Sequence, residues 1–247
     1  MRKLPQYFMI NPYGDGAAAH GTAWFKENFK RFPCGHYDND DKFFDRVFVH
    51  EIDTRCAVGF IGAWLNYLRL DFLDALQPEI SQADHVRFGA LIDNETGVVL
   101  EDWKTVWMPS VPLRSGKGSL YWACETCGKK LYSYSQPCDY VMEADAQNRP
   151  IFMANNWLII RNDIRERLLK HPNWATMKKK IRFMKIKILK EPLDDYPADL
   201  STYDPVIINV NEFSIDSYGV PSSVFYQRLK EKYEMRPHDE SSKNHSG

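Results

Sequence analysis

Hydrophobic residues repeat every four positions through the segment from Ala57 to Leu76. The residues in this repeat are Phe60, Trp64, Leu68 and Phe72. A spacing close to 3.6 residues places side chains on one face of a helix, so the pattern predicts a buried helix over Ala57–Leu76. Pro78 would end this helix, because proline lacks the backbone N–H that a continuing helix requires.

Two further segments have helical spacing, one near each end of the chain. The first lies within residues 17–32, and the second is PSSVFYQRLKEKY at 221–233, which begins with a proline suited to a first helical turn. The residues that share a face are Phe25, Phe29 and Phe32 in the first segment, and Phe225, Leu229 and Tyr233 in the second. Both segments are predicted to be amphipathic helices.

The middle of the chain has the pattern of strands. In HVRFGALI, at 85–92, every second residue is apolar, as expected of a strand with one buried face. The turn-forming sequence DNETG follows at 93–97 and leads into the apolar run VVLEDWKTVWM. These features predict two antiparallel strands joined by a turn, and RVFVHEI at 46–52 is also strand-like.

A helix followed by a strand is predicted in the last third of the chain. Asp163 and Glu166 have the spacing of a capping box, in which two side chains bond the free N–H groups at a helix start. Ile164 and Leu168 would form the buried stripe, and Pro172 would follow the end of the helix. Apolar residues then alternate with lysines, which predicts a strand. These apolar residues are Met184, Ile186 and Ile188.

Together these elements predict the α+β class, with mostly antiparallel sheets and packed helices. We expect residues 1–190 to form the main domain. Residues 191–235 would form a C-terminal extension with a loop rich in proline and aspartate, a strand within PVIINVNEF and the helix described above. Residues 236–247 are polar and are expected to form a disordered tail.

The composition indicates the cellular location of the protein and the class of partner that it binds. The formal net charge is −1, from 32 basic and 33 acidic residues, so no overall field favours nucleic acid, and nucleic-acid binding is not expected. No apolar run approaches the roughly 20 residues of a membrane span, and the N-terminal residues lack the apolar run of a signal peptide. Five cysteines without such a peptide indicate a reducing, cytoplasmic location.

Cysteines supply the main candidate chemistry. Cys124, Cys127 and Gly128 form a CxxCG knuckle, a spacing at which two thiolates can bind one tetrahedral zinc ion. Two more ligands are needed, and Cys34 with His36, in FPCGHY, forms a second and incomplete knuckle. The sequence therefore predicts at most one structural zinc ion. The alternative is that the cysteines pack as small hydrophobic residues.

Two charged segments are candidate binding surfaces. The acidic residues Asp38, Asp40, Asp41 and Asp45 are interpreted as a docking surface for a basic partner, or else as a solvated loop. The segment MKKKIRFMKIKILK, at 177–190, would be either a stripe for phosphate groups, with Phe183 stacking on bases, or a strand with lysines on its outer face.

Three of these pieces occur in an order that resembles a known group of proteins. They are RFGALIDNETGVVLEDWKTVWMP, then CETCG with the Cys-Gly pair far upstream, then WLIIRNDIRERLLKH followed by a strand. This order looks like that of the double-CxxCG motif proteins and related immunity proteins of bacterial polymorphic-toxin systems. The likeness covers roughly residues 85–190. The first knuckle departs from the pattern, because Arg31 stands in place of its first cysteine.

The resemblance implies a non-enzymatic, cytoplasmic protein that binds and neutralises a cognate toxin domain. Tight association of this kind needs aromatic anchors and a polar rim with complementary charge rather than catalytic residues. Two alternatives stay open. One is a zinc-knuckle protein that binds nucleic acid, and the other is an enzyme whose site is assembled from residues distant in the sequence.

Overall fold

The computed structural model describes most of the chain up to residue 191 and a short strand beyond it. The described residues are 5–12, 18–19, 32–34, 43–50, 52–61, 65–114, 120–128, 130–133, 140–154, 157–191 and 206–208. Strand β2 (Ala18–Ala19) occupies the start of the helix predicted within 17–32. The rest of that prediction up to residue 31, the helix at 221–233 and the tail at 236–247 lie outside the described residues.

The chain divides into two compact units, each built from three separate segments. Unit 1 consists of Met1–Arg31, Tyr37–Leu113 and Tyr140–Lys190, and unit 2 of Phe32–His36, Arg114–Asp139 and Glu191–Gly247. Unit 2 therefore combines parts of the predicted main domain with the predicted C-terminal extension.

Unit 1 contains two six-stranded sheets, and in the first the N-terminal strand lies between two late strands. Its strand order is β11-β14-β1-β13-β12-β8. The strands are β1 (Tyr7–Pro12), β8 (Ser110–Val111), β11 (Tyr140–Met142), β12 (Ile151–Ala154), β13 (Trp157–Arg161) and β14 (Ile181–Leu189). β1 pairs antiparallel with both β13 and β14, and its ladder with β14 extends over the full length of β1, from Tyr7 to Pro12.

The second sheet of unit 1 has the order β2-β4-β5-β7-β6-β3. Its other strands are β3 (Arg46–Val49), β4 (Val58–Ile61), β5 (Leu65–Arg69), β6 (Arg87–Asp93) and β7 (Val99–Trp107). The predicted hairpin is confirmed, since β6 and β7 are antiparallel neighbours on either side of 94–98. One buried cluster joins the two sheets, with Ile10, Ile151 and Ile160 from the first packed with Val58, Leu68 and Val106 from the second.

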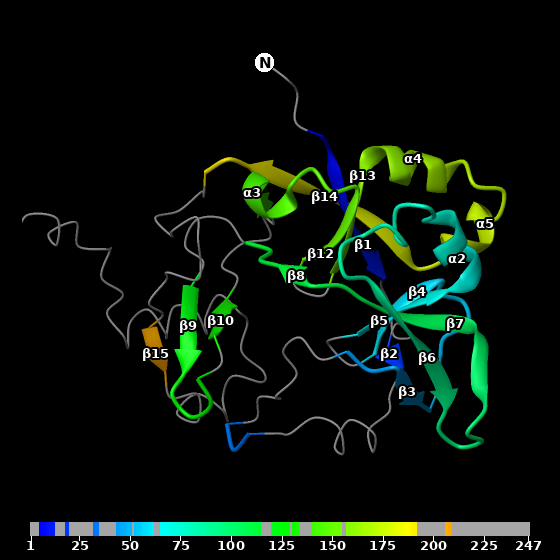
Figure 1. Ribbon diagram of the computed structural model, residues 1–247, viewed down its shortest axis with the longest axis horizontal. Coiled ribbons are helices and arrows are strands. Elements are labelled where there is room, and N and C mark those ends of the chain that lie inside the picture. Colours follow the sequence, from blue (N-terminus) through cyan, green and yellow to red (C-terminus); the bar gives the residue numbers. More distant parts are fainter. Residues whose placement is uncertain are drawn as a thin grey trace, which may run out of the picture. The chain divides into compact units, whose positions relative to one another are not determined.

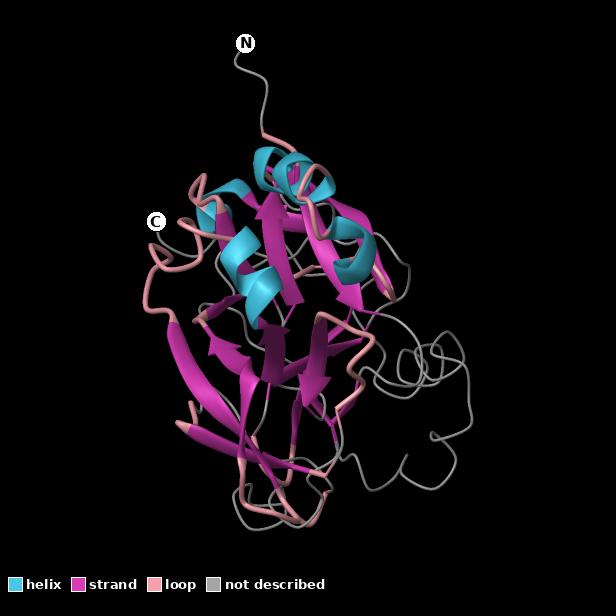
Figure 2. Cartoon of the chain, turned by 90° about the vertical axis from the view of Figure 1, so that its right-hand side faces the viewer, coloured by secondary structure: helices cyan, strands magenta, loops and turns pink. Residues whose placement is uncertain are grey.

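The described residues of unit 1 include four short helices, and Figure 2 shows them gathered at one end of its strands. They are α2 (Leu70–Ala75), α3 (Glu143–Ala146), α4 (Asn162–Leu169) and α5 (Trp174–Met177). Phe72 of α2, Ile164 and Leu168 of α4, and Met177 of α5 are fully buried in the cluster that joins the sheets. The described chain is thus α+β, with strands predominant and the longest ladders antiparallel.

The single helix predicted over Ala57–Leu76 is wrong for most of its length. The segment forms the antiparallel strands β4 and β5, with Val58 opposite Leu68, and among its described residues only Leu70–Ala75 is helical. A repeat of four residues is also a multiple of the strand period of two, so the same apolar residues also fit one face of a strand. Gly59 allows this arrangement, because a Cβ there would overlap the ring of Tyr67 on β5.

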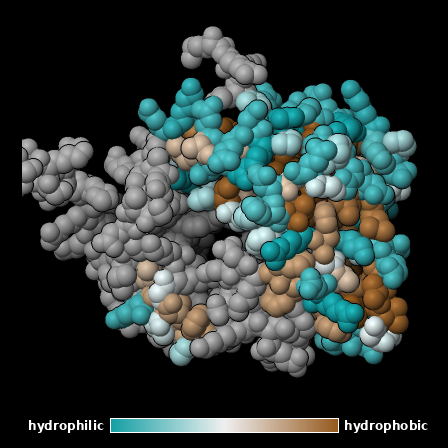
Figure 3. Space-filling view, in the orientation of Figure 1, coloured by the Kyte–Doolittle hydropathy of each residue, from teal (hydrophilic) through white to brown (hydrophobic). Residues whose placement is uncertain are grey.

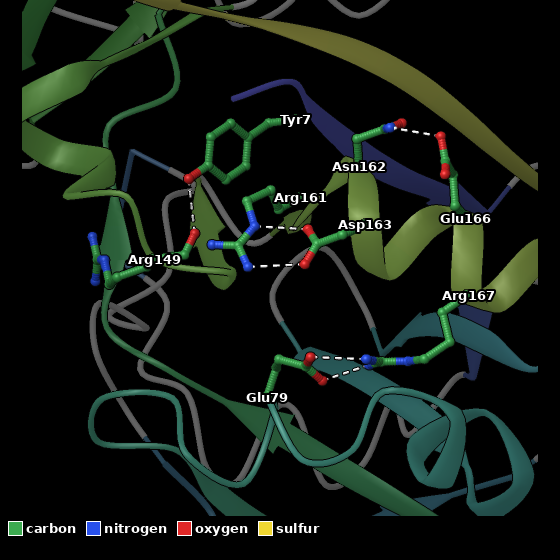
Figure 4. Close-up of polar contacts among 8 residues, drawn as sticks. All are labelled: Tyr7, Glu79, Arg149, Arg161, Asn162, Asp163, Glu166 and Arg167. Atoms are coloured by element: carbon green, nitrogen blue, oxygen red, sulfur yellow. Dashed lines mark hydrogen bonds and ion pairs between the residues drawn. The ribbon is translucent and has the colours of Figure 1, made fainter. Parts of the chain in front are cut away.

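The predicted capping box at Asp163 and Glu166 is also wrong, although the helix exists. α4 begins at Asn162, so its N-cap is Arg161, two residues before the predicted Asp163, and the Arg161 side chain does not cap the helix. Asp163 instead accepts hydrogen bonds from the Arg161 guanidinium at 2.7 and 2.9 Å, and Glu166 accepts one from the Asn162 side-chain amide at 2.9 Å (Figure 4). Asp163 in the first turn favours the helix by its charge near the positive end of the helix dipole.

Unit 2 contains a three-stranded sheet in the order β10-β9-β15 (Figure 1). Its strands are β9 (Leu120–Cys124), β10 (Lys130–Ser133) and β15 (Val206–Ile208). β9 and β10 are an antiparallel hairpin, and β15 runs parallel to β9 on its other side. The strand predicted within PVIINVNEF is therefore confirmed over Val206–Ile208.

Candidate metal centre

The β9–β10 hairpin of unit 2 positions two cysteines at its turn. Cys124 is the last residue of β9, and Cys127 lies in the turn that follows. Gly128 has φ of 70°, a left-handed conformation that glycine adopts without strain, and its N–H bonds to the Cys124 carbonyl at 2.7 Å. The knuckle predicted from CETCG therefore forms, and its glycine closes the turn that brings the two thiols to the same side.

Cys34, far upstream in the sequence, contributes the third thiol. The Sγ atoms of Cys34, Cys124 and Cys127 all lie within 4.8 Å of one another. Cys34 and Cys124 are buried, and Cys127 is half-buried. None of the three forms a disulfide bond. The three residues belong to unit 2, and we call them the three-cysteine centre.

Hydrogen bonds at the centre favour a thiolate at Cys124. Burial by itself raises the pKa of this thiol, but the backbone N–H groups of Cys127 and Thr126 donate to its sulfur, as do the thiols of Cys34 and Cys127. The net result is a Cys124 pKa below the ordinary value. A thiolate is the form of cysteine that binds metal, so this environment prepares Cys124 as a ligand.

The donor set fits a thiophilic metal ion. Zn–S bonds of about 2.3 Å in a tetrahedron put sulfur atoms about 3.8 Å apart, so the three sulfurs need to move by only about 1 Å to bind one zinc ion. Three of the four predicted ligands are thus brought together. The fourth, His36, lies outside the described residues.

Of the four acidic residues predicted to bind a partner, the structure describes Asp45. Asp45 is exposed and precedes β3 in unit 1, and its backbone carbonyl accepts a hydrogen bond from the Ala90 N–H at 2.8 Å. This contact fixes Asp45 beside β6. Asp38, Asp40 and Asp41 lie outside the described residues.

The basic segment at 177–190 forms strand β14, with Lys185 and Lys187 exposed. Phe183 is not exposed for stacking on a base. Its ring is half-buried and stacks on Trp174, with centroids 5.6 Å apart, while the Arg165 guanidinium lies 5.5 Å from its centroid. These contacts favour a strand with lysines on its outer face over a phosphate-binding stripe.

A partly buried ionic contact in unit 1 was not predicted from the sequence. The Asp53 side chain is 8% exposed and accepts hydrogen bonds from Arg55 and Lys180. The bond from Arg55 is the largest cause of a strongly lowered Asp53 pKa. Lys180 is distant in the sequence, so no spacing could indicate this pair. The adjacent Cys56 is a buried free thiol of unit 1, and burial raises its pKa.

None of the described helices is long and apolar enough to cross a membrane. Comparisons with models of known protein families and with curated proteins give no match to this chain.

Proposed function

We propose that this protein is a cytoplasmic immunity protein, which binds and neutralises a cognate bacterial toxin domain and carries one structural zinc ion at its three-cysteine centre. The main support is the convergence of Cys34, from the incomplete first knuckle, with Cys124 and Cys127 of the second. The resemblance to double-CxxCG motif proteins depends on these two pieces acting together, although they lie far apart in the sequence.

The proposed zinc ion would act on structure and not on a substrate. When bound, it supplies a cross-link between three thiolates and a fourth ligand. Cys34 would then hold its segment to the β9–β10 hairpin. Such a cross-link would stabilise a unit whose described residues form a three-stranded sheet.

Unit 1 supplies a surface suited to a protein partner. Phe88, Val98 and Val99, on and beside the β6–β7 hairpin, are among the exposed large hydrophobic residues. Figure 3 shows a hydrophobic area over these strands in a surface that is otherwise largely hydrophilic. Exposed apolar residues of this kind are typical of protein interfaces.

Charged and aromatic residues lie at the Phe88 end of the β6–β7 hairpin. The Arg87 guanidinium lies 5.4 Å from the Phe43 ring centroid and 5.6 Å from that of Trp107, and arginines and aromatic residues are enriched at interface centres. The exposed Asp45 is fixed beside Gly89 and Ala90 of the same hairpin, where it would face a basic toxin. We propose that this surface binds the toxin.

The direct test is purification together with the toxin domain encoded beside this gene. We expect a stable complex and loss of the toxin's activity. Replacing Phe88 with Ala and Asp45 with Lys should weaken the complex by about 1 kcal/mol or more each. Leu169→Ala, at an exposed apolar residue of α4, is the matched control and should have no effect. Failure to form a complex with the neighbouring toxin would overturn the proposal.

A further inference from the structure

Strand β15 depends on β9 for its place in the sheet. β15 has three residues, Val206–Ile208, and pairs in parallel with β9 through Val206 opposite Trp122, Ile207 opposite Ala123 and Ile208 opposite Cys124. Within the described residues, β9 is its strand neighbour. So short a strand has few backbone bonds, and its stability follows from how firmly its neighbour is held.

The end of β9 that pairs with β15 is also part of the three-cysteine centre. The backbone of Cys124 pairs with that of Ile208, and its sulfur lies close to the sulfurs of Cys34 and Cys127. Its carbonyl also accepts the N–H of Gly128, which closes the turn. One residue therefore connects the proposed metal ligands with the last pair of the β9–β15 ladder.

We propose that metal binding at the three-cysteine centre controls the pairing of β15 with β9. The inference rests on the structural zinc ion proposed above. A bound ion draws the three sulfurs to about 3.8 Å from one another and fixes the backbone of Cys124. Without the ion, the end of β9 is held by the hairpin alone, and β15 separates from it.

Coupling of this kind is reciprocal. If the metal-bound state favours the pairing of β15, then the pairing of β15 raises the affinity for the metal by the same factor. Ile207→Pro, at the middle of β15, removes a backbone N–H and disrupts the strand without changing any cysteine. This variant should therefore bind zinc more weakly than the wild-type protein, whereas Ile207→Val should not.

The test is hydrogen exchange of the full chain, with one equivalent of zinc and after removal of the metal by a chelator. We expect the amides of 206–208 to exchange about tenfold faster or more without metal, while those of β6 and β7 keep their rates. Cys34→Ser, measured in the presence of zinc, should match the metal-free protein. Cys56→Ser removes a buried thiol of unit 1 and should match the wild type.

The outcomes distinguish the proposed coupling of β15 from the proposed structural zinc ion. If zinc binds at about one ion per chain and the exchange of 206–208 is the same with and without it, the coupling is wrong and the structural zinc ion stands. If no zinc is retained, both are wrong. If Ile207→Pro has wild-type affinity for zinc, the coupling is also wrong. None of these measurements uses the toxin, so they do not depend on the immunity function.

Discussion

Lys180 donates a hydrogen bond from Nζ to Oδ2 of Asp53 at 2.9 Å. This contact links the residue immediately before β14, a strand of the first sheet of unit 1, to the loop before β4, a strand of the second. Because the Asp53 side chain is almost fully covered, its charge depends on Lys180 and on Arg55 for compensation.

Lys180→Met should destabilise the protein by about 1–2 kcal/mol at neutral pH, because it removes a hydrogen bond between charged groups. The folded-state pKa of Asp53 lies below the ordinary value, so the stabilisation is complete above the unfolded pKa of about 3.9 and is lost as the pH falls below it. The difference between the variant and the wild type in urea denaturation should therefore shrink at acid pH. Lys179→Met, at an exposed neighbour, is the control, and a difference that persists at low pH would contradict the assignment.

Tyr67→Phe should leave the stability unchanged or raise it by up to about 1 kcal/mol. The Tyr67 hydroxyl is buried and has no hydrogen-bond partner in the described part of the chain, and burial raises its pKa. Removing an unpaired buried hydroxyl removes a desolvation cost. Tyr7→Phe is the matched control. Tyr7→Phe should lower the free energy of unfolding by about 1 kcal/mol, because the Tyr7 hydroxyl donates a hydrogen bond to the Arg149 carbonyl at 2.9 Å. Chemical denaturation measures both, and a larger loss for Tyr67→Phe than for Tyr7→Phe would refute the prediction.

Gly59→Ala should lower the free energy of unfolding by about 1–3 kcal/mol in chemical denaturation, because the new Cβ overlaps the ring of Tyr67 and forces this core side chain to move. Gly97→Ala provides the comparison. Gly97 has φ of 70° and nothing within 4 Å of a Cβ, so only backbone strain of about 1 kcal/mol is expected. In a Tyr67→Ala background, Gly59→Ala should no longer lower the free energy of unfolding by this amount. If it still does, the overlap with Tyr67 is not the cause.

Cys127→Ser should reduce the zinc content of the purified protein from about one ion per chain to near zero, because it removes one of three thiolates. Acidification should release zinc from the wild-type protein, since protons compete with the metal for thiolates. Metal analysis by mass spectrometry measures both effects. Equal zinc contents in Cys127→Ser and the control Cys56→Ser would place the metal elsewhere.

The sequence was informative where a pattern has one interpretation. The alternation at 85–92 and the turn at 93–97 predicted β6 and β7 correctly, because a period of two with turn residues has no helical equivalent. The repeat of four between Phe60 and Phe72 has two interpretations, and only contact with β7, from a later segment, selects the strand. At the three-cysteine centre, the Cys124–Cys127 spacing was a local pattern. The approach of Cys34 required the tertiary fold.

Placing β1 between β13 and β14 has a consequence for synthesis on the ribosome. β1 is made first and carries the buried residues Tyr7, Met9 and Ile10, yet both of its neighbours lie more than a hundred residues downstream. The apolar side chains of β1 therefore stay uncovered until β14, which ends at residue 189, has left the exit tunnel and can pair with it. Nascent chains stalled before this point should bind chaperones, and release should coincide with the appearance of β14.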